Sequence, residues 1–153
     1  PEFQAQLLRV IEAMRKAPGV GLAAPRLGIS ERVFVLEDKE ELMATIIATG
    51  SEVALAVKAQ KLLLDKKVDV RVVSMPSVGL FEAQDAEYKK NTIGVAKDKV
   101  VAVEMLTSFG WYRYADTVMG IDTFGASAPM ADVVKKFDFT SERLVSLVEK
   151  IAK

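Results

Sequence analysis

The sequence contains no cysteine and no histidine among its 153 residues. Disulfide bonds, thiolate nucleophiles, zinc sites built on cysteine or histidine, and catalytic triads with a histidine base are therefore excluded within this chain. Any acid–base chemistry would depend on Asp, Glu, Lys or Tyr, whose pKa values would have to be shifted by burial or by neighbouring groups. We accordingly assign no catalytic residue and no metal ligand from the sequence.

An excess of charge of either sign is also missing, because 21 basic residues balance 21 acidic ones. No overall field would draw the chain to a polyanion, and we expect no nucleic-acid partner. No apolar run reaches the 18 or so residues that span a bilayer, so we expect no membrane partner. The N-terminus lacks the charged and then apolar pattern of a signal peptide, and we expect a soluble, cytoplasmic protein.

The stretch that organises the fold is a short apolar run at residues 45–48, followed by Gly50 and Ser51. The run predicts a parallel strand buried on both faces, the glycine allows a sharp turn, and the serine is a suitable helix N-cap. Apolar residues then recur at helical spacing over residues 53–64, which predicts a crossover helix and a βαβ unit.

Anionic ligands often bind at the helix N-terminus of such units. A second corner of small residues, 124–129, is expected at the same end of the sheet. An alternative remains open, in which these residues are only caps and turns. The candidate anion-binding residues are Thr49, Gly50, Ser51 and Ser127.

The rest of the chain predicts an α/β fold, with a mixed, mostly parallel Rossmann-like sheet flanked by helices. An added N-terminal helix and edge strand complete it. Strands are expected at residues 32–38, 68–75, 100–105 and 118–123, and helices at 3–16, 80–90, 130–137 and 141–152, the last capped by Thr140 or Ser141.

Residues 19–25, Gly-Val-Gly-Leu-Ala-Ala-Pro, stand between the first helix and the first strand. With the flanking elements, they resemble the N-terminal part of a peptide deformylase. The resemblance implies a glutamine after the proline, which would stabilise an oxyanion, but this chain has Arg26. It also implies a metal held by one cysteine and two histidines, which the chain lacks. We therefore interpret Gly19, Gly21, Leu22 and Arg26 as a remnant of the motif, with the glycines serving packing and a turn.

Five blocks of sequence follow in order, at residues 48–53, 71–77, 80–84, 101–104 and 122–129. Together they resemble the C-terminal domain of a transketolase, and the likeness extends over residues 37–153. The resemblance implies that other domains hold thiamine diphosphate and its divalent metal, and that this domain adds structure and some subunit contact.

Together the two resemblances predict a chimera that was engineered or selected and produced recombinantly. A deformylase-like segment, 1–36, would join a transketolase-like part, 37–153, in one α/β domain over 1–153. The borrowed strand would extend the sheet edge, and the N-terminal helix would cover an exposed sheet face. We expect no independent catalytic activity, no cofactor, and a chain that is not an enzyme.

Three alternatives remain open at this point. The chain could be a small-anion or nucleotide binding module that uses the crevice at the strand C-termini, or the structural and dimer-contact domain of a thiamine-diphosphate transketolase. It could also form a homodimer or a domain-swapped dimer, driven partly by the cluster around Trp111 and Tyr112. Glu104 and Asp122 are the only carboxylates that we consider for acid–base work, and each is equally explained as a polar group at a strand end.

Overall fold

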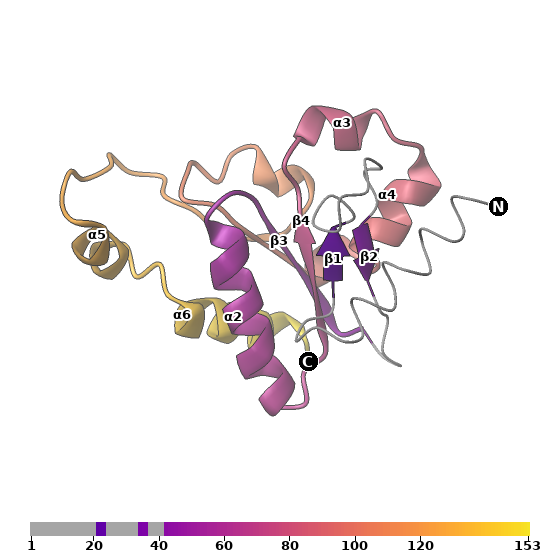
Figure 1. The fold of residues 1–153 in the computed structure, drawn as a ribbon, viewed down its shortest axis with the longest axis horizontal. Coiled ribbons are helices and arrows are strands. Elements are labelled where there is room, and N and C mark those ends of the chain that lie inside the picture. Colours follow the sequence, from indigo (N-terminus) through magenta and orange to yellow (C-terminus); the bar gives the residue numbers. More distant parts are fainter. Residues whose placement is uncertain (1–20, 24–33, 37–41) are drawn as a thin grey trace. The chain divides into compact units, whose positions relative to one another are not determined.

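A computed structural model of the chain describes residues 21–23, 34–36 and 42–153 (Figure 1). The chain divides into two units, residues 1–40 and 41–153, which we describe separately. The helix expected at residues 3–16 lies outside the described residues, as do Gly19 and Arg26.

The described part of the first unit is a pair of short strands. β1 (Gly21–Ala23) pairs antiparallel with β2 (Phe34–Leu36), with Gly21 opposite Leu36. The strand expected at residues 32–38 is thus present, but its partner differs from the prediction. β2 pairs with β1 in a two-stranded sheet and is not a strand of the larger sheet. Pairing with a segment close in sequence closes a short loop, which costs less entropy than pairing with a distant strand.

The second unit is built on four parallel strands in the order β4–β3–β5–β6. β3 lies in the interior of the sheet, and all five of its residues are buried. This arrangement confirms the predicted α/β class and the parallel pairing of the first two strands. The strands are β3 (Ala44–Ala48), β4 (Val70–Ser74), β5 (Val100–Val103) and β6 (Thr117–Met119).

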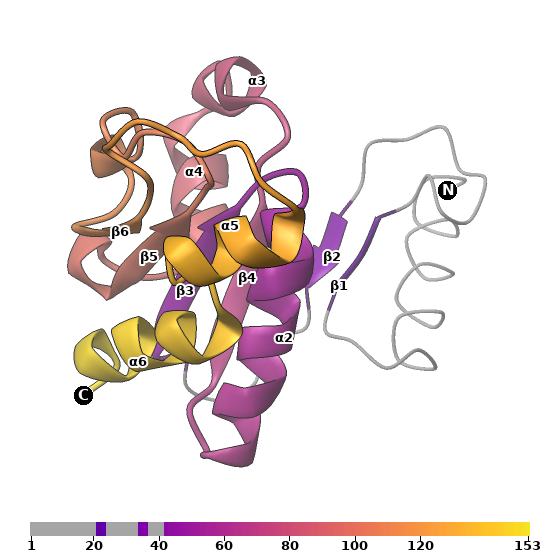
Figure 2. The same ribbon diagram turned by 90° about the vertical axis from the view of Figure 1, so that its left-hand side faces the viewer.

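Alternate residues of each strand face two separate cores, because side chains in a strand point to opposite faces in turn. On one face, Ile46 and Val101 pack with Leu63 of α2 (Glu52–Asp65) and Leu144 of α6 (Ser141–Ile151). α2 and α6 lie together on this side of the sheet (Figures 1 and 2). This apolar cluster contains most of the fully buried side chains.

The other face packs Ile47, Val73 and Ala102 against Phe81 of α3 (Val78–Glu82) and Tyr114. α4 (Ala86–Ile93) lies on this side in Figure 1. The sheet is therefore covered on both faces, as expected for parallel strands that are apolar throughout.

One helix was expected at residues 80–90, and that prediction is wrong, because the structure has two. α3 ends at Glu82, and α4 begins after Asp85, whose side chain accepts a hydrogen bond from the Tyr88 amide at 2.7 Å. This N-cap satisfies an amide that a continuous helix would pair differently, so it favours a new helix start.

The last strand is also shorter than predicted, because β6 ends at Met119 and not at Thr123. At Gly120 a Cβ atom would lie 3.0 Å from the Leu106 carbonyl oxygen, so the neighbouring loop approaches the backbone closely. The Ile121 amide then donates to that carbonyl at 2.8 Å.

The two closing helices are confirmed as α5 (Met130–Lys136) and α6. Thr140 is the N-cap of α6, and its hydroxyl accepts from the Arg143 amide at 3.2 Å. Within the described ranges, none of the helices combines the length and the hydropathy needed to traverse a bilayer.

Candidate functional site

The point where the sheet's connections diverge lies between β3 and β5. From β3 the chain crosses through α2 to β4 on one side, and from β5 it proceeds to β6 on the other side. The carboxyl ends of two such strands form the usual ligand crevice of an open α/β sheet. In this chain that edge carries residues 49–52 after β3 and Glu104 after β5.

The backbone at the end of β3 turns as the sequence predicts, but the cap differs in detail. Gly50 has a φ of 54°, in the left-handed region that favours glycine. Ser51 occupies the N-cap position of α2 yet makes no side-chain capping bond, and its hydroxyl instead donates to the Glu52 carboxylate at 3.0 Å. The serine therefore orients an acidic side chain.

Glu52 and Glu104 form a pair of buried carboxyl groups at this edge. Their exposed fractions are only 7% and 9%. Burial, followed by the neighbouring Glu52 carboxyl, raises the pKa of Glu104 to about 7. The Met105 amide acts in the opposite direction. Two close carboxyls cannot both ionise at low cost, so Glu104 keeps its proton to a higher pH than an exposed glutamate does.

A backbone hydrogen bond also holds Glu104 in place. Its amide donates to the Met119 carbonyl at 3.2 Å, which continues the pairing of β5 with β6 by one residue. The Glu104 side chain is therefore held between the first turn of α2 and the end of the sheet. This group can take up or release a proton at neutral pH.

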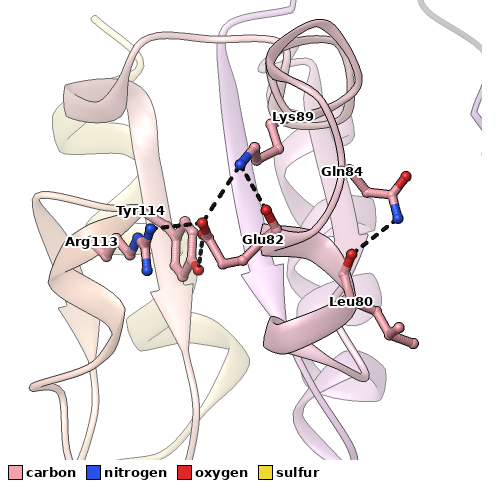
Figure 3. Close-up of polar contacts among 6 residues, drawn as sticks. All are labelled: Leu80, Glu82, Gln84, Lys89, Arg113 and Tyr114. Carbon is pink, nitrogen blue, oxygen red and sulfur yellow. Dashed lines mark hydrogen bonds and ion pairs between the residues drawn. The ribbon is translucent and has the colours of Figure 1, made fainter.

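A second polar cluster lies around Glu82, at the end of α3 (Figure 3). Its carboxylate accepts from the Tyr114 hydroxyl at 2.5 Å and from the Arg113 guanidinium at 2.7 Å, and Lys89 Nζ lies 3.6 Å away. The Tyr114 hydrogen bond, followed by the charges of Arg113 and Lys89, lowers the pKa of Glu82. Burial and then Glu82 raise the pKa of Tyr114 to about 12. Each charge has a partner, so the cluster ties α3 to the β5–β6 connection.

Asp122 also acts as a structural group. Its carboxylate accepts from the Ser108 amide at 2.8 Å, the Ser108 hydroxyl at 2.7 Å and the Thr107 hydroxyl at 3.1 Å. These bonds, led by the Ser108 amide, lower the pKa of Asp122. Of the two carboxylates considered for acid–base work, only Glu104 has the raised pKa that a general acid at neutral pH requires.

The structure brings together three of the four candidate anion-binding residues. Thr49, Gly50 and Ser51 are consecutive at the β3–α2 corner, whereas Ser127 is exposed on the β6–α5 connection. Within residues 42–153, no hydrogen bond joins Ser127 to that corner. The anion site stays a prediction, and the two buried carboxyls place negative charge close to it.

Of the deformylase-motif residues, Gly21 and Leu22 lie in β1. Sequence reasoning missed Glu52 entirely. The available signal was an acidic residue on the first turn of a helix after a buried strand, together with Glu104 at the end of an otherwise apolar run.

Comparisons with known proteins now define the family. The family model described as "Transketolase-like TK C-terminal domain" matches residues 33–140. The "Polypeptide deformylase" model matches residues 1–57. Both predicted resemblances are thus confirmed. The junction that we predicted between residues 36 and 37 lies inside the range that both models match.

Curated relatives support the larger match. The chain is 47% identical over 120 residues to the probable transketolase of Streptococcus pneumoniae, covering 76% of this chain and 18% of that protein. It is 43% identical over 129 residues to the transketolase of Bacillus subtilis, covering 81% and 19%. The chain therefore spans about a fifth of the length of these relatives.

Solved structures agree with the sequence relatives. The transketolase from Leishmania mexicana matches with a TM-score of 0.69 and 44% identity over 75% of this chain and 17% of that one. A transketolase from Pichia stipitis matches with a TM-score of 0.69 and 34% identity over 76% and 17%.

The expectation that the chain is not an enzyme is wrong at the level of the family, because the relatives are named transketolases, which are enzymes. The absence of cysteine and histidine excludes particular chemistries within the chain, but it does not show that the chain lies outside a family of enzymes. A family model that matches most of the residues, relatives at more than 40% identity and a shared fold lead to one conclusion: the chain belongs to the transketolase C-terminal domain family.

Proposed function

We propose that this chain serves as the C-terminal domain of a transketolase, where it adds structure and subunit contact to an enzyme whose other domains lie outside it. The observation that carries the proposal is the four-stranded parallel sheet, whose fold and sequence both match the C-terminal part of solved transketolases. Homologous folds can host different functions, so the test has to measure the role itself.

The described residues do not fit the cofactor of the family. Thiamine diphosphate binds through a divalent metal, which needs oxygen or nitrogen ligands grouped around it. Among residues 21–23, 34–36 and 42–153, no group of three or more Asp, Glu, His or Cys could hold a metal ion. We therefore place no step of ketol transfer on these residues.

The direct test is reconstitution. Bacillus subtilis transketolase is truncated to remove the C-terminal region that this chain matches, and the full 153-residue chain is added. We expect the added chain to restore dimer formation and ketol transfer in the presence of thiamine diphosphate and Mg²⁺. A variant with Ile46→Asp, at a fully buried strand position, is the control, because it removes the fold and should restore nothing. Failure of the unaltered chain to change either the dimer or the activity would contradict the proposal.

The chimeric origin belongs to the same proposal. The two family matches overlap over residues 33–57, which include β2, β3 and the first turn of α2. A join within this range would keep a strand on each side of it. We infer an engineered or selected fusion that behaves as one domain over residues 1–153. Mild proteolysis followed by urea unfolding tests this, because loss of residues 1–30 without loss of stability would contradict a single domain.

Self-association is the remaining part of the proposal. A domain that supplies subunit contact retains surface that another chain normally covers, so we expect a homodimer or domain-swapped dimer at high concentration. Light scattering over a dilution series measures it, and a monomer at all concentrations would contradict this part.

A further inference from the structure

Three of the largest exposed apolar side chains lie on two loops at the carboxyl end of the sheet. Leu106 and Phe109 belong to the β5–β6 connection, and Phe124 belongs to the β6–α5 connection. Their exposed fractions are 65%, 87% and 99%. Single exposed apolar residues are common in proteins, but a group of large ones needs a cause.

Hydrogen bonds hold these two loops side by side. The Asp122 carboxylate accepts three bonds from Thr107 and Ser108, and the Ile121 amide donates to the Leu106 carbonyl at 2.8 Å. Phe109 directly follows Ser108, and Phe124 is two residues beyond Asp122, so the two rings project from neighbouring, pinned segments. We call Leu106, Phe109 and Phe124 the loop-end patch.

The packing of the sheet does not use this patch. Tyr114 and Trp111, from the same connection, pack inward against Phe81 and the strands, whereas Tyr112 is half-exposed and the patch residues are exposed further. The loop thus divides its aromatic side chains between a core and a solvent-facing group. The Asp122 carboxylate points at the loop itself, where Ser108 and Thr107 donate to it.

The size of the patch indicates what covers it. The two phenylalanine side chains, at about 150–250 Å² each, and the partly exposed Leu106 together present on the order of 400–500 Å². A stable complex of free partners buries about 800 Å² on each side, which the patch alone does not supply. Contacts between domains of one chain bury about 600–1,500 Å² in total, and the patch is large enough to be one side of such a contact.

We propose that the loop-end patch is the docking surface for the rest of a transketolase, that is, the part of the enzyme outside the region that this chain matches. The inference rests on the function proposed above. More than four-fifths of each relative lies outside the region that this chain matches, so the occupant is a large protein surface normally joined to this domain. The patch is the apolar centre of that contact, and the surface around it supplies the remaining area that a stable complex of free partners needs.

The test uses the full chain and the truncated Bacillus subtilis transketolase, produced in the same cells so that the truncated enzyme can fold against the added domain. The variant is the double substitution Phe109→Ser with Phe124→Ser. The matched control is Leu64→Ser with Tyr88→Ser, which changes two half-exposed apolar residues on α2 and α4, away from these loops. Urea unfolding of each chain alone verifies that the substitutions leave the fold intact.

We expect the unaltered chain and the control to co-purify with the truncated enzyme, and the double variant to bind about tenfold more weakly or worse, since buried aromatic anchors dominate such contacts. Equal binding of all three chains would overturn the loop-end patch and leave the proposed function standing. No binding by any of them would overturn the proposed function. A loss of self-association in the double variant, without a change in binding to the enzyme, would assign the patch to a second copy of this chain and would also overturn the inference.

Discussion

Replacing Glu104 by glutamine is expected to remove a pH dependence from the free energy of unfolding. In the folded chain, burial and Glu52 raise the pKa of Glu104 from 4.5 to about 7. The folded state therefore binds this proton more tightly than the unfolded state does. The resulting stability is fully present below pH 4.5, declines as the pH rises, and is lost above about pH 7.

The size of the effect follows from the pKa difference. Each pKa unit corresponds to about 1.36 kcal/mol, so the difference sets an upper limit of about 3 kcal/mol. Solvent near the rim of the sheet screens part of this, and we expect about 2 kcal/mol. Glutamine keeps the shape of the protonated acid and can donate to Glu52, so the Glu104→Gln chain should equal the unaltered chain at pH 4.5 and exceed its stability at pH 8.

Urea unfolding at half-unit intervals from pH 4.5 to 8.5 measures the difference between the two chains. Glu87→Gln, at an exposed position on α4, controls for the loss of a carboxylate as such, and its curve should run parallel to that of the unaltered chain. Parallel curves for Glu104→Gln as well would refute the raised pKa of Glu104 and the part that burial and Glu52 play in it.

Three further substitutions test the framework around the site. Gly94→Ala should destabilise the chain by about 1–3 kcal/mol in urea unfolding, because Gly94 has a φ of 76° and the new methyl group would lie 2.8 Å from Arg71 Cζ. Tyr114→Phe removes the hydroxyl whose pKa is raised to about 12, so stability that the unaltered chain loses between pH 10 and 12 should no longer be lost in that window, as alkaline titration by circular dichroism would show. The same change frees Glu82 from its shortest hydrogen bond and should lower the thermal midpoint at neutral pH. Asp122→Ala should accelerate amide hydrogen exchange in the β5–β6 connection while leaving exchange in β3 unchanged. Exchange in the connection at the rate of the unaltered chain would contradict the role of Asp122 as a loop anchor.

The strands of the main sheet could be predicted because each one is a short run of apolar residues that is itself typical of a buried strand. The run at residues 45–48 is apolar and β-branched, and the structure extends it by only one residue, to Ala44. The crossover helix expected at 53–64 is likewise one residue longer at each end. Burial on both faces leaves few alternatives for such segments.

The predicted ends of helices and strands were wrong where a single side chain or a single close contact determines the backbone conformation. The break between α3 and α4 depends on a single Asp85 cap, which no apolar periodicity reveals. The early end of β6 depends on the Leu106 loop approaching Gly120, a contact between segments that the sequence alone does not bring together. The prediction for the partner of β2 was wrong for a similar reason. The residue pattern of a strand indicates that it is extended, but it does not say which other strand it pairs with.

The β3–α2 corner shows how the same residues support two opposite electrostatic descriptions. From the sequence, Gly50 and Ser51 at a helix N-terminus predict a site for an anion. In the structure, the first turn of α2 already carries an acidic side chain, Glu52, and a second one, Glu104, approaches from β5. The favourable field at the helix N-terminus acts on a carboxylate of the chain itself. The two carboxyl groups therefore set the charge of this corner, whereas the loops beyond β5 and β6 expose the apolar residues of the loop-end patch.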